Sequence, residues 1–173
     1  MLRSPGSELD VSPIDKQRVL HSLRSRLAET LRDLTDSQKE VQAGAVHEET
    51  RAEDPKDTRA TEASYLARGL AQRVAALESA VARLQVLHPR RFGPDDAIAL
   101  SALIGLEDEA GGCSVVLLVP GGAGETLTID GETIQPVTPG SPLGRALIGC
   151  RAGDDVEVEL PGGTQQLAIS WVE

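Results

Sequence analysis

The fold of the C-terminal half is decided by a stretch that reads, over residues 141–163, SPLGRALIGCRAGDDVEVELPGG. Ser141 followed by Pro142 predicts a helix start, because serine caps free N–H groups and proline is tolerated at the first helical position. Gly149 predicts the end of this short helix. The alternation of apolar and acidic residues over 155–160 then predicts a half-buried strand, which a Pro-Gly-Gly turn ends.

Further candidate strands flank this stretch, separated by glycine-rich turns. In the last of them, Leu167, Ile169 and Trp171 alternate with other residues, so we expect all three on one face of a sheet. The segment 120–124 is rich in glycine but has no following Lys-Ser or Lys-Thr, which favours a hairpin turn over a phosphate-binding loop. Several strands with one helix predict an α+β domain with an antiparallel sheet. The other candidate strands cover 97–106, 114–119, 126–129, 133–137 and 166–172.

The first half of the chain carries two series of apolar residues with a seven-residue period, typical of the a and d positions of a coiled coil. Both series have small residues near 44–63. This predicts an antiparallel α-helical hairpin that begins at Ser12-Pro13 and thins toward its tip, with arms about 45 Å long. The first series is Leu20, Leu27, Leu34 and Val41 with Leu23, Thr30, Ser37 and Gly44; the second is Ala63, Leu70, Leu77 and Leu84 with Ala60, Ala67, Val74 and Val81.

Composition divides the chain into two unlike parts. Residues 1–90 hold 14 basic and 14 acidic side chains, whereas 91–173 hold 3 basic and 13 acidic ones and 14 of the 17 glycines. We therefore expect a disordered tail over 1–12, the coiled-coil hairpin over 13–88, a linker over 89–94 and the β-rich domain over 95–173.

Several classes of function are disfavoured by composition. The net charge of −10 argues against independent binding to duplex DNA, and an aromatic content of 2% argues against base-stacking sites. No apolar run approaches the ~20 residues of a membrane span, and the N-terminus has no apolar segment typical of a secretory signal. Cys113 and Cys150 lack metal-binding spacing. A cytoplasmic protein without membrane contact is expected.

Acidic residues gather between the two apolar series, at Glu53, Asp54 and Asp57. Pro55 suits the first turn of a new helix, and an acid in that turn suits the helix dipole. The segment is therefore either a capped, solvated turn or a set of oxygen ligands for a divalent ion. Because Mg²⁺ usually keeps waters or shares its ligands with a phosphate-bearing partner, the second interpretation requires the tip to enter another protein's active site.

The C-terminal motifs, in their order and spacing, resemble those of the Gre-type transcript cleavage factors, the GreA/GreB family. The motifs are SPLGRALIG over 141–149, Gly-Asp before Val156 and Val158, and Pro-Gly-Gly over 161–163. The resemblance implies an antiparallel coiled coil followed by an FK506-binding-protein-like domain. It also implies a bacterial transcription elongation factor that enters the secondary channel of core RNA polymerase. Such a factor is no enzyme itself: its tip acids would help to hold Mg²⁺ near the nascent RNA 3′ end while the polymerase hydrolyses backtracked RNA.

Two tip acids in a D-x-x-E arrangement carry this role in the family. Asp54 and Asp57 are the nearest equivalents here, and the resemblance implies that they share a magnesium ion with the polymerase. A count without gaps from residues 72–74 would instead put the family's two acids at Glu53 and Lys56, so Glu53 is also a candidate.

The resemblance further implies a partner-binding surface in the loop before the short helix, at Thr138, Pro139, Ser141 and Pro142; helix capping alone is the alternative. Four functions stay open, and one of them, peptidyl-prolyl isomerisation, is disfavoured because Phe92 and Trp171 are the only aromatic residues of 91–173. The protein could stimulate RNA cleavage, or it could inhibit the polymerase from the same channel without cleavage, since Pro55 replaces a leucine of the family's tip and the second acid is Asp, not Glu. The third function is that of a coiled-coil adaptor with a β-rich interaction domain.

Overall fold

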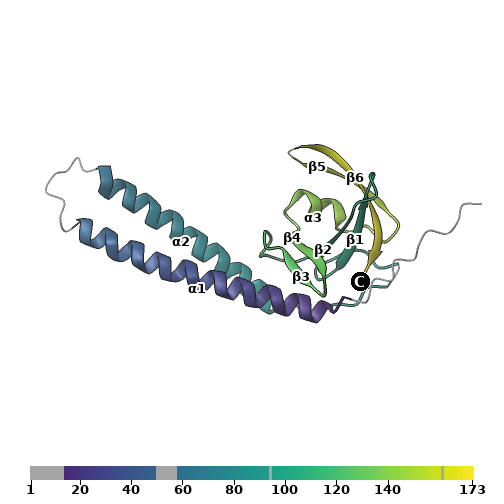
Figure 1. Cartoon of the computed structure of the whole chain (residues 1–173), viewed down its shortest axis with the longest axis horizontal. Helices are drawn as coiled ribbons and strands as arrows, with labels where there is room; N and C mark the ends of the chain where they lie inside the picture. The colour runs from purple at the N-terminus through teal and green to yellow at the C-terminus, as the bar shows by residue number, and fades with distance from the viewer. Residues whose placement is uncertain (1–13, 50–57, 94, 161) are drawn as a thin grey trace, which may run out of the picture.

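The computed structural model describes residues 14–49, 58–93, 95–160 and 162–173. Helices α1 (Lys16–Glu49) and α2 (Thr58–Gln85) run antiparallel as a hairpin that projects from a β-domain (Figure 1). The 34 residues of α1 span about 50 Å at about 1.5 Å per residue. The expected class, a helical hairpin followed by a sheet with one short helix, is confirmed. None of the helices in these described ranges is long and apolar enough to cross a membrane.

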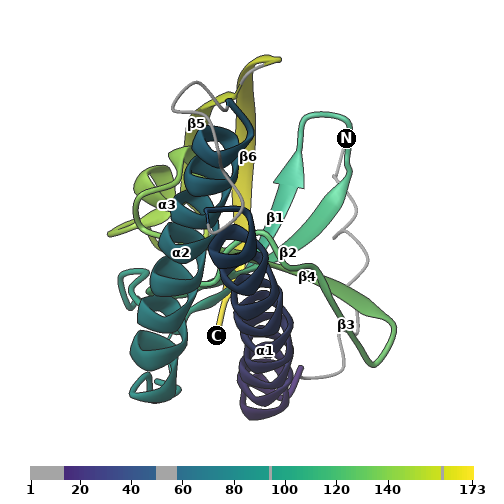
Figure 2. The same ribbon diagram turned by 90° about the vertical axis from the view of Figure 1, so that its left-hand side faces the viewer.

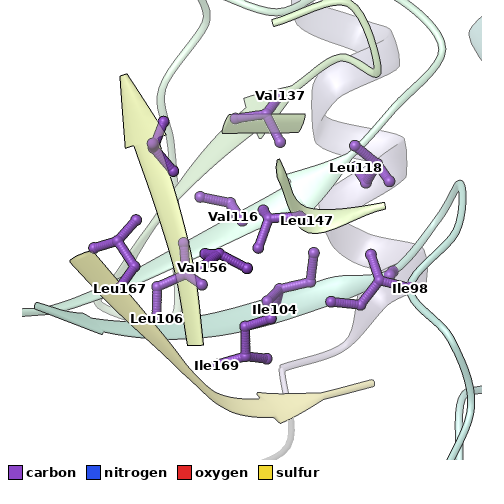
Figure 3. Close-up of a cluster of buried hydrophobic side chains, with 12 residues drawn as sticks. Ile98, Ile104, Leu106, Val116, Leu118, Val137, Leu147, Val156, Leu167 and Ile169 are labelled. Atoms are coloured by element: carbon purple, nitrogen blue, oxygen red, sulfur yellow. The ribbon is translucent and has the colours of Figure 1, made fainter. Parts of the chain in front are cut away.

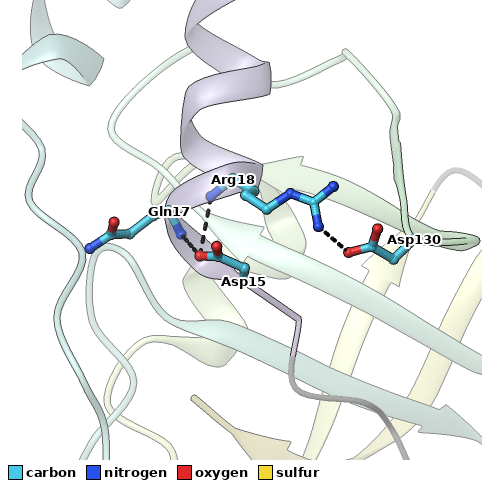
Figure 4. A network of polar contacts seen from close by, with 4 residues as sticks. All are labelled: Asp15, Gln17, Arg18 and Asp130. Atoms are coloured by element: carbon cyan, nitrogen blue, oxygen red, sulfur yellow. Dashed lines mark hydrogen bonds and ion pairs between the residues drawn. The ribbon is translucent and has the colours of Figure 1, made fainter.

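Helix α1 begins later than the sequence predicts. Its cap is Asp15, whose Oδ1 atom accepts hydrogen bonds from the N–H groups of Gln17 at 2.9 Å and Arg18 at 3.3 Å (Figure 4). A carboxylate in this position satisfies free N–H groups and complements the helix dipole. The predicted start at Ser12-Pro13 lies outside the described residues.

Burial along the hairpin falls from the sheet toward the tip. Leu20, Leu27 and Leu84, at the base, are 3% exposed or less, whereas Leu34 and Val41 are half-buried. This agrees with the predicted thinning, because smaller side chains toward the tip cover less of the opposite helix.

The seam of α1 departs from the predicted heptads in its distal half. Ser37 and Gly44 are exposed, while Leu31 and Gln38 are half-buried. In a straight helix, two residues seven positions apart differ by about 20° in direction around the helix axis. Along α1 the residues that face α2 therefore shift away from the heptad positions to neighbouring ones.

The β-domain contains one six-stranded sheet with the order β3-β4-β2-β1-β6-β5. Neighbouring strands are antiparallel except β2 and β4, which are parallel. The sheet is therefore mixed, and the predicted all-antiparallel pairing is wrong at this pair. The strands are β1 (Leu103–Asp108), β2 (Cys113–Leu118), β3 (Leu127–Ile129), β4 (Glu132–Val137), β5 (Asp155–Leu160) and β6 (Gly163–Val172).

The glycine-rich segment after β2 is not the predicted hairpin turn, because β2 does not pair with β3. It lies against both helices of the hairpin instead. A Cβ atom on Gly121 would sit 3.0 Å from the Cβ of Ala80 in α2, and one on Gly122 would overlap Leu27 in α1. Gly122 also has a φ of +83°, which favours glycine. These glycines let the loop approach the helices closely.

The first predicted strand, 97–106, is extended only from Leu103. Before it, the Ile98 N–H donates to the carbonyl of Cys150 at 2.8 Å, which ties this segment to the end of the short helix. The chain then turns at Ser101, a fully buried residue with a φ of +73°. The sequence did not predict this turn, because the segment is mostly apolar and a non-glycine residue such as Ser101 rarely adopts a positive φ.

Both faces of the sheet are covered, by different elements. One face packs against α3 (Pro142–Leu147) and carries the buried cluster of Figure 3, which includes Val116 and Leu118. The other face packs against the base of the hairpin and carries Leu117 and Val119. The alternation along β2 thus fills two cores, which explains its almost continuously apolar sequence.

Trp171 does not share a face with Leu167 and Ile169 as predicted. In the pairing of β1 with β6, Gly105 of β1 pairs with Trp171 and the next residue, Leu106, pairs with Ile169. One residue of β6 therefore has no partner in β1 and forms a bulge. One extra residue moves the side chains beyond it to the opposite face. Trp171 therefore packs with the hairpin-side cluster, and its ring lies where a Cβ on Gly105 would stand.

Candidate functional site: hairpin tip and docking loop

The hairpin carries one end of each helix far from the sheet. Helix α1 ends at Glu49 and α2 begins at Thr58, at the end opposite the β-domain (Figure 1). The three candidate acids Glu53, Asp54 and Asp57 belong to the connection between these two residues and lie outside the described residues. The described helices thus bring Glu49 and Thr58 to the same end of the molecule, and the placement of the acids stays a prediction.

Charge is distributed unevenly along the hairpin. Residues 33–62 contain nine acids and four bases, whereas 16–32 and 68–91 each contain five bases and one acid. The hairpin is therefore acidic toward its tip and basic toward the sheet. The net charge of residues 1–90 is zero, so the total charge does not reveal this division.

Part of the basic excess at the base pairs with acids of the β-domain. Arg18 Nη1 lies 2.8 Å from Asp130 Oδ2 (Figure 4), and Arg26 Nε lies 3.6 Å from Glu125 Oε2. Arg26 Nη1 also donates to the Thr126 carbonyl at 2.9 Å. Because these pairs are exposed, each adds little stability but favours one orientation of the two units.

Two large apolar side chains near the tip are exposed. Tyr65 and Leu66, in the distal part of α2, are 68% and 70% exposed. They point away from the seam, which passes through the half-buried Ala67 and Leu70.

The predicted docking loop is built around the cap of α3. The Ser141 hydroxyl donates to the Thr138 carbonyl at 2.8 Å and accepts from the Gly144 N–H at 3.0 Å. Pro142 occupies the first turn and is exposed, whereas Pro139 is half-buried. The structure therefore brings the four predicted residues together, but Ser141 is engaged within the loop and positions it.

A cavity of about 350 Å³ lies beside this loop, between α3 and the sheet. Sequence reasoning missed it because its walls come from five strands and one helix. Ser141 and Pro142 border it, and so does Leu160, which is 41% exposed. Leu160 continues the apolar alternation of Val156 and Val158 along β5, so the sequence carried no separate signal for the cavity. The other lining residues are Leu106, Ser114, Val116, Gln135, Val137, Leu143, Val158, Gln165 and Leu167.

The described residues offer no alternative metal centre. Within these ranges, no group of three or more His, Cys, Asp or Glu side chains could hold a metal ion. Cys150 packs at the end of α3, and burial, followed by the negative charge of Asp154, raises the pKa of its thiol. A raised pKa lowers the thiolate fraction, and the side chain packs against the cluster beside α3, which is consistent with a packing role for Cys150.

Replacing Ser141 by alanine is expected to lower the free energy of unfolding by about 1 kcal/mol, because α3 loses its cap. Urea unfolding of the full chain measures this change. Ser37→Ala, at an exposed position of α1, is the control and should be neutral within about 0.5 kcal/mol. Equal effects at both positions would contradict the capping role.

Proteins with similar sequences were found for the C-terminal part and for the whole chain. The family description "Transcription elongation factor, GreA/GreB, C-term" matches residues 94–173. Transcription elongation factor GreA of Polaromonas naphthalenivorans (strain CJ2) is 33% identical over 100 residues, covering 58% of this chain and 60% of that protein. Transcription elongation factor GreA of Sulfurovum sp. (strain NBC37-1) is 29% identical over 160 residues, covering 92% and 95%.

The match therefore spans less than two thirds of the first relative and nearly all of the second. Among solved structures, GreA factor homolog 1 (Gfh1) of Thermus thermophilus is 22% identical, with 87% of this chain and 94% of that chain covered and a TM-score of 0.36.

Proposed function

Because residues 94–173 match the GreA/GreB family of transcription elongation factors and GreA proteins are similar to the chain beyond this region, we propose that the chain binds bacterial core RNA polymerase, with the hairpin in the secondary channel and the β-domain at its mouth. The observation that carries this proposal is the attachment of a hairpin about 50 Å long to the family's C-terminal domain. A projecting arm of this length can reach an active centre that lies below the surface of a partner.

The tip acids would act in the polymerase's active centre. Asp54 and Asp57, with Glu53 as the alternative first acid, offer only carboxylate oxygens, the donor type that Mg²⁺ prefers. This donor set fits a magnesium ion shared with the polymerase, whose chemistry there is to activate water for the hydrolysis of backtracked RNA. The chain's own part is to bring carboxylates to the nascent RNA 3′ end, and the hydrolysis stays an activity of the polymerase.

Docking at the channel mouth would use the loop at Thr138, Pro139, Ser141 and Pro142 together with the adjacent cavity. Residues 92–173 contain 13 acids and two bases, so a basic protein surface is favoured as the partner and nucleic acid is disfavoured. The apolar cavity walls would accept side chains of that surface.

A second candidate function is favoured by the sequence of the tip. Pro55 stands between the candidate acids, and Asp57 is one methylene shorter than the glutamate of the family. Both departures would change how far the second carboxylate reaches. A protein with this tip would occupy the channel and slow nucleotide addition without stimulating cleavage. The adaptor alternative loses support because the C-terminal domain belongs to the elongation-factor family.

Binding is tested first, with full-length protein and purified bacterial core polymerase. We expect a Kd of about 1 μM or tighter, as for a specific protein interface. No binding at tenfold higher concentration would overturn the proposal.

RNA cleavage in a backtracked complex at fixed Mg²⁺ then separates the two functions. Stimulated cleavage assigns the first function, and slowed nucleotide addition without cleavage assigns the second.

A further inference from the structure

The hairpin and the β-domain share one continuous hydrophobic core. Leu20 and Leu23 of α1 and Leu84 of α2 are buried in the same cluster as Leu103 and Leu117 of the sheet. Each of these side chains is 1% exposed or less. Two domains are free to move when their interface is small and polar, whereas a shared apolar core disfavours pivoting.

A buried lysine ties the start of α1 to the linker. Lys16 is only 8% exposed, and its Nζ atom donates to the Arg90 carbonyl at 2.6 Å. The same Nζ atom lies 5.0 Å from the ring centre of Phe92, and the Arg90 guanidinium lies 4.8 Å from it. The only phenylalanine of the chain is thus in contact with two cations, one from α1 and one from the linker.

Burial of Lys16 is unfavourable by itself. Desolvation lowers the pKa of its amine, and the nearby Glu173 partly opposes this shift. A buried cation is tolerated only when it is well paired, so the bond to Arg90 and the ring of Phe92 are required in this geometry. The amine therefore holds the linker in one position.

The rest of the linker is also fixed by specific hydrogen bonds. The Arg90 N–H donates to the hydroxyl of the fully buried Ser101 at 2.9 Å. Arg24 of α1 donates to the carbonyls of Leu84 at 3.1 Å and Leu87 at 2.6 Å, where α2 ends. These hydrogen bonds make the segment between α2 and the sheet a rigid connection.

We propose that Lys16, Phe92 and Ser101 are positioning residues that hold the hairpin in one direction relative to the β-domain. Docking of the β-domain would then determine where the hairpin tip lies. The functional meaning of this direction rests on the proposed function. The rigidity itself does not, so it can be tested on the free protein.

Electron–electron distance measurements between two spin labels on the full chain test this proposal. The exposed Cys113 of β2 provides one label site, and Ser37→Cys, exposed on α1, provides the other. Cys150→Ala removes the remaining thiol. In this background we expect a single, narrow distance distribution.

Lys16→Met keeps an apolar stem but removes the amine, and we expect it to widen the distribution at least twofold or to add a second distance. The matched control is Lys39→Met, on the same helix, where the lysine makes only an exposed pair with Asp36. This control should reproduce the parent distribution. Phe92→Leu, which keeps bulk but removes the aromatic face, should widen it as Lys16→Met does.

Two outcomes would overturn the proposal. A broad or bimodal distribution in the parent protein would show that the joint is not rigid, and an unchanged narrow one in both joint variants would show that these residues do not set the direction. Leu147→Ala, in the core beside α3, separates positioning from stability: it should lower the melting temperature without changing the distances. Polymerase binding plays no part in these readouts, so their failure differs from failure of the proposed function.

Discussion

Replacing Asp54 and Asp57 together by alanine should reduce stimulated RNA cleavage at least about 100-fold, while the Kd for core polymerase stays unchanged. The proposed role of these two carboxylates is to supply oxygen ligands to a magnesium ion shared with the polymerase, and metal-assisted hydrolysis depends on such ligands. Affinity should persist because the proposed docking surface lies on the β-domain, about 50 Å away along the hairpin. Single-turnover cleavage in a backtracked complex and a separate binding titration measure the two effects.

The matched control carries Asp33→Ala and Glu40→Ala, two exposed acids of α1 that precede the tip. It removes the same charge from the hairpin and should cleave at the parent rate. Cleavage unchanged in the tip variant would reject Asp54 and Asp57 as ligands. A matching loss in the control would instead assign the effect to the overall charge of the hairpin. Glu53→Ala, made separately, tests the alternative first acid.

Gly144→Ala is expected to destabilise the β-domain by about 3 kcal/mol, because an added Cβ would overlap the Thr138 carbonyl oxygen. That oxygen also accepts the hydrogen bond from Ser141, so relief of the overlap would distort the docking loop. We therefore expect polymerase affinity to fall about tenfold or more even at temperatures where the protein stays folded. Urea unfolding and a binding titration measure the two effects.

Gly140→Ala is the control for this change. It lies in the same loop, is not held at positive φ, and has no atom within 4 Å of an added Cβ. Stability should therefore be nearly unchanged. If Gly144→Ala were as stable as Gly140→Ala, the tight packing of α3 on Thr138 would be wrong. If it were unstable but bound normally, the loop would not be the docking surface.

The elements with local signals could be predicted from the sequence. The cap of α3 requires only Ser141, Pro142 and the following residues, and it is confirmed in detail. The hairpin follows from apolar periodicity, although its seam drifts at Ser37 because a straight helix does not keep an exact heptad. The loop before α3 could be located because its motif is short and contiguous, whereas its docking role and the tip acids stay predictions.

Features that depend on long-range pairing could not be predicted. The parallel contact of β2 with β4 and the bulge that turns Trp171 toward the hairpin depend on strand order, which alternating residues do not encode. The cavity beside α3 gathers residues from five strands. Its apolar residues and those of the core look alike along the chain, since both alternate with polar ones.

The core shared by hairpin and sheet also bears on how the chain is synthesised. Leu20 and Leu23 emerge first, but Leu103 and Leu117, which cover them, follow on the order of 10 s later at about 5–20 residues per second. During this interval these leucines at the base of the newly synthesised hairpin stay exposed, because the residues that bury them are distant in sequence. A fragment that contains only the hairpin would leave these leucines exposed to water, and we expect it to self-associate, so the isolated hairpin is no substitute for the full chain.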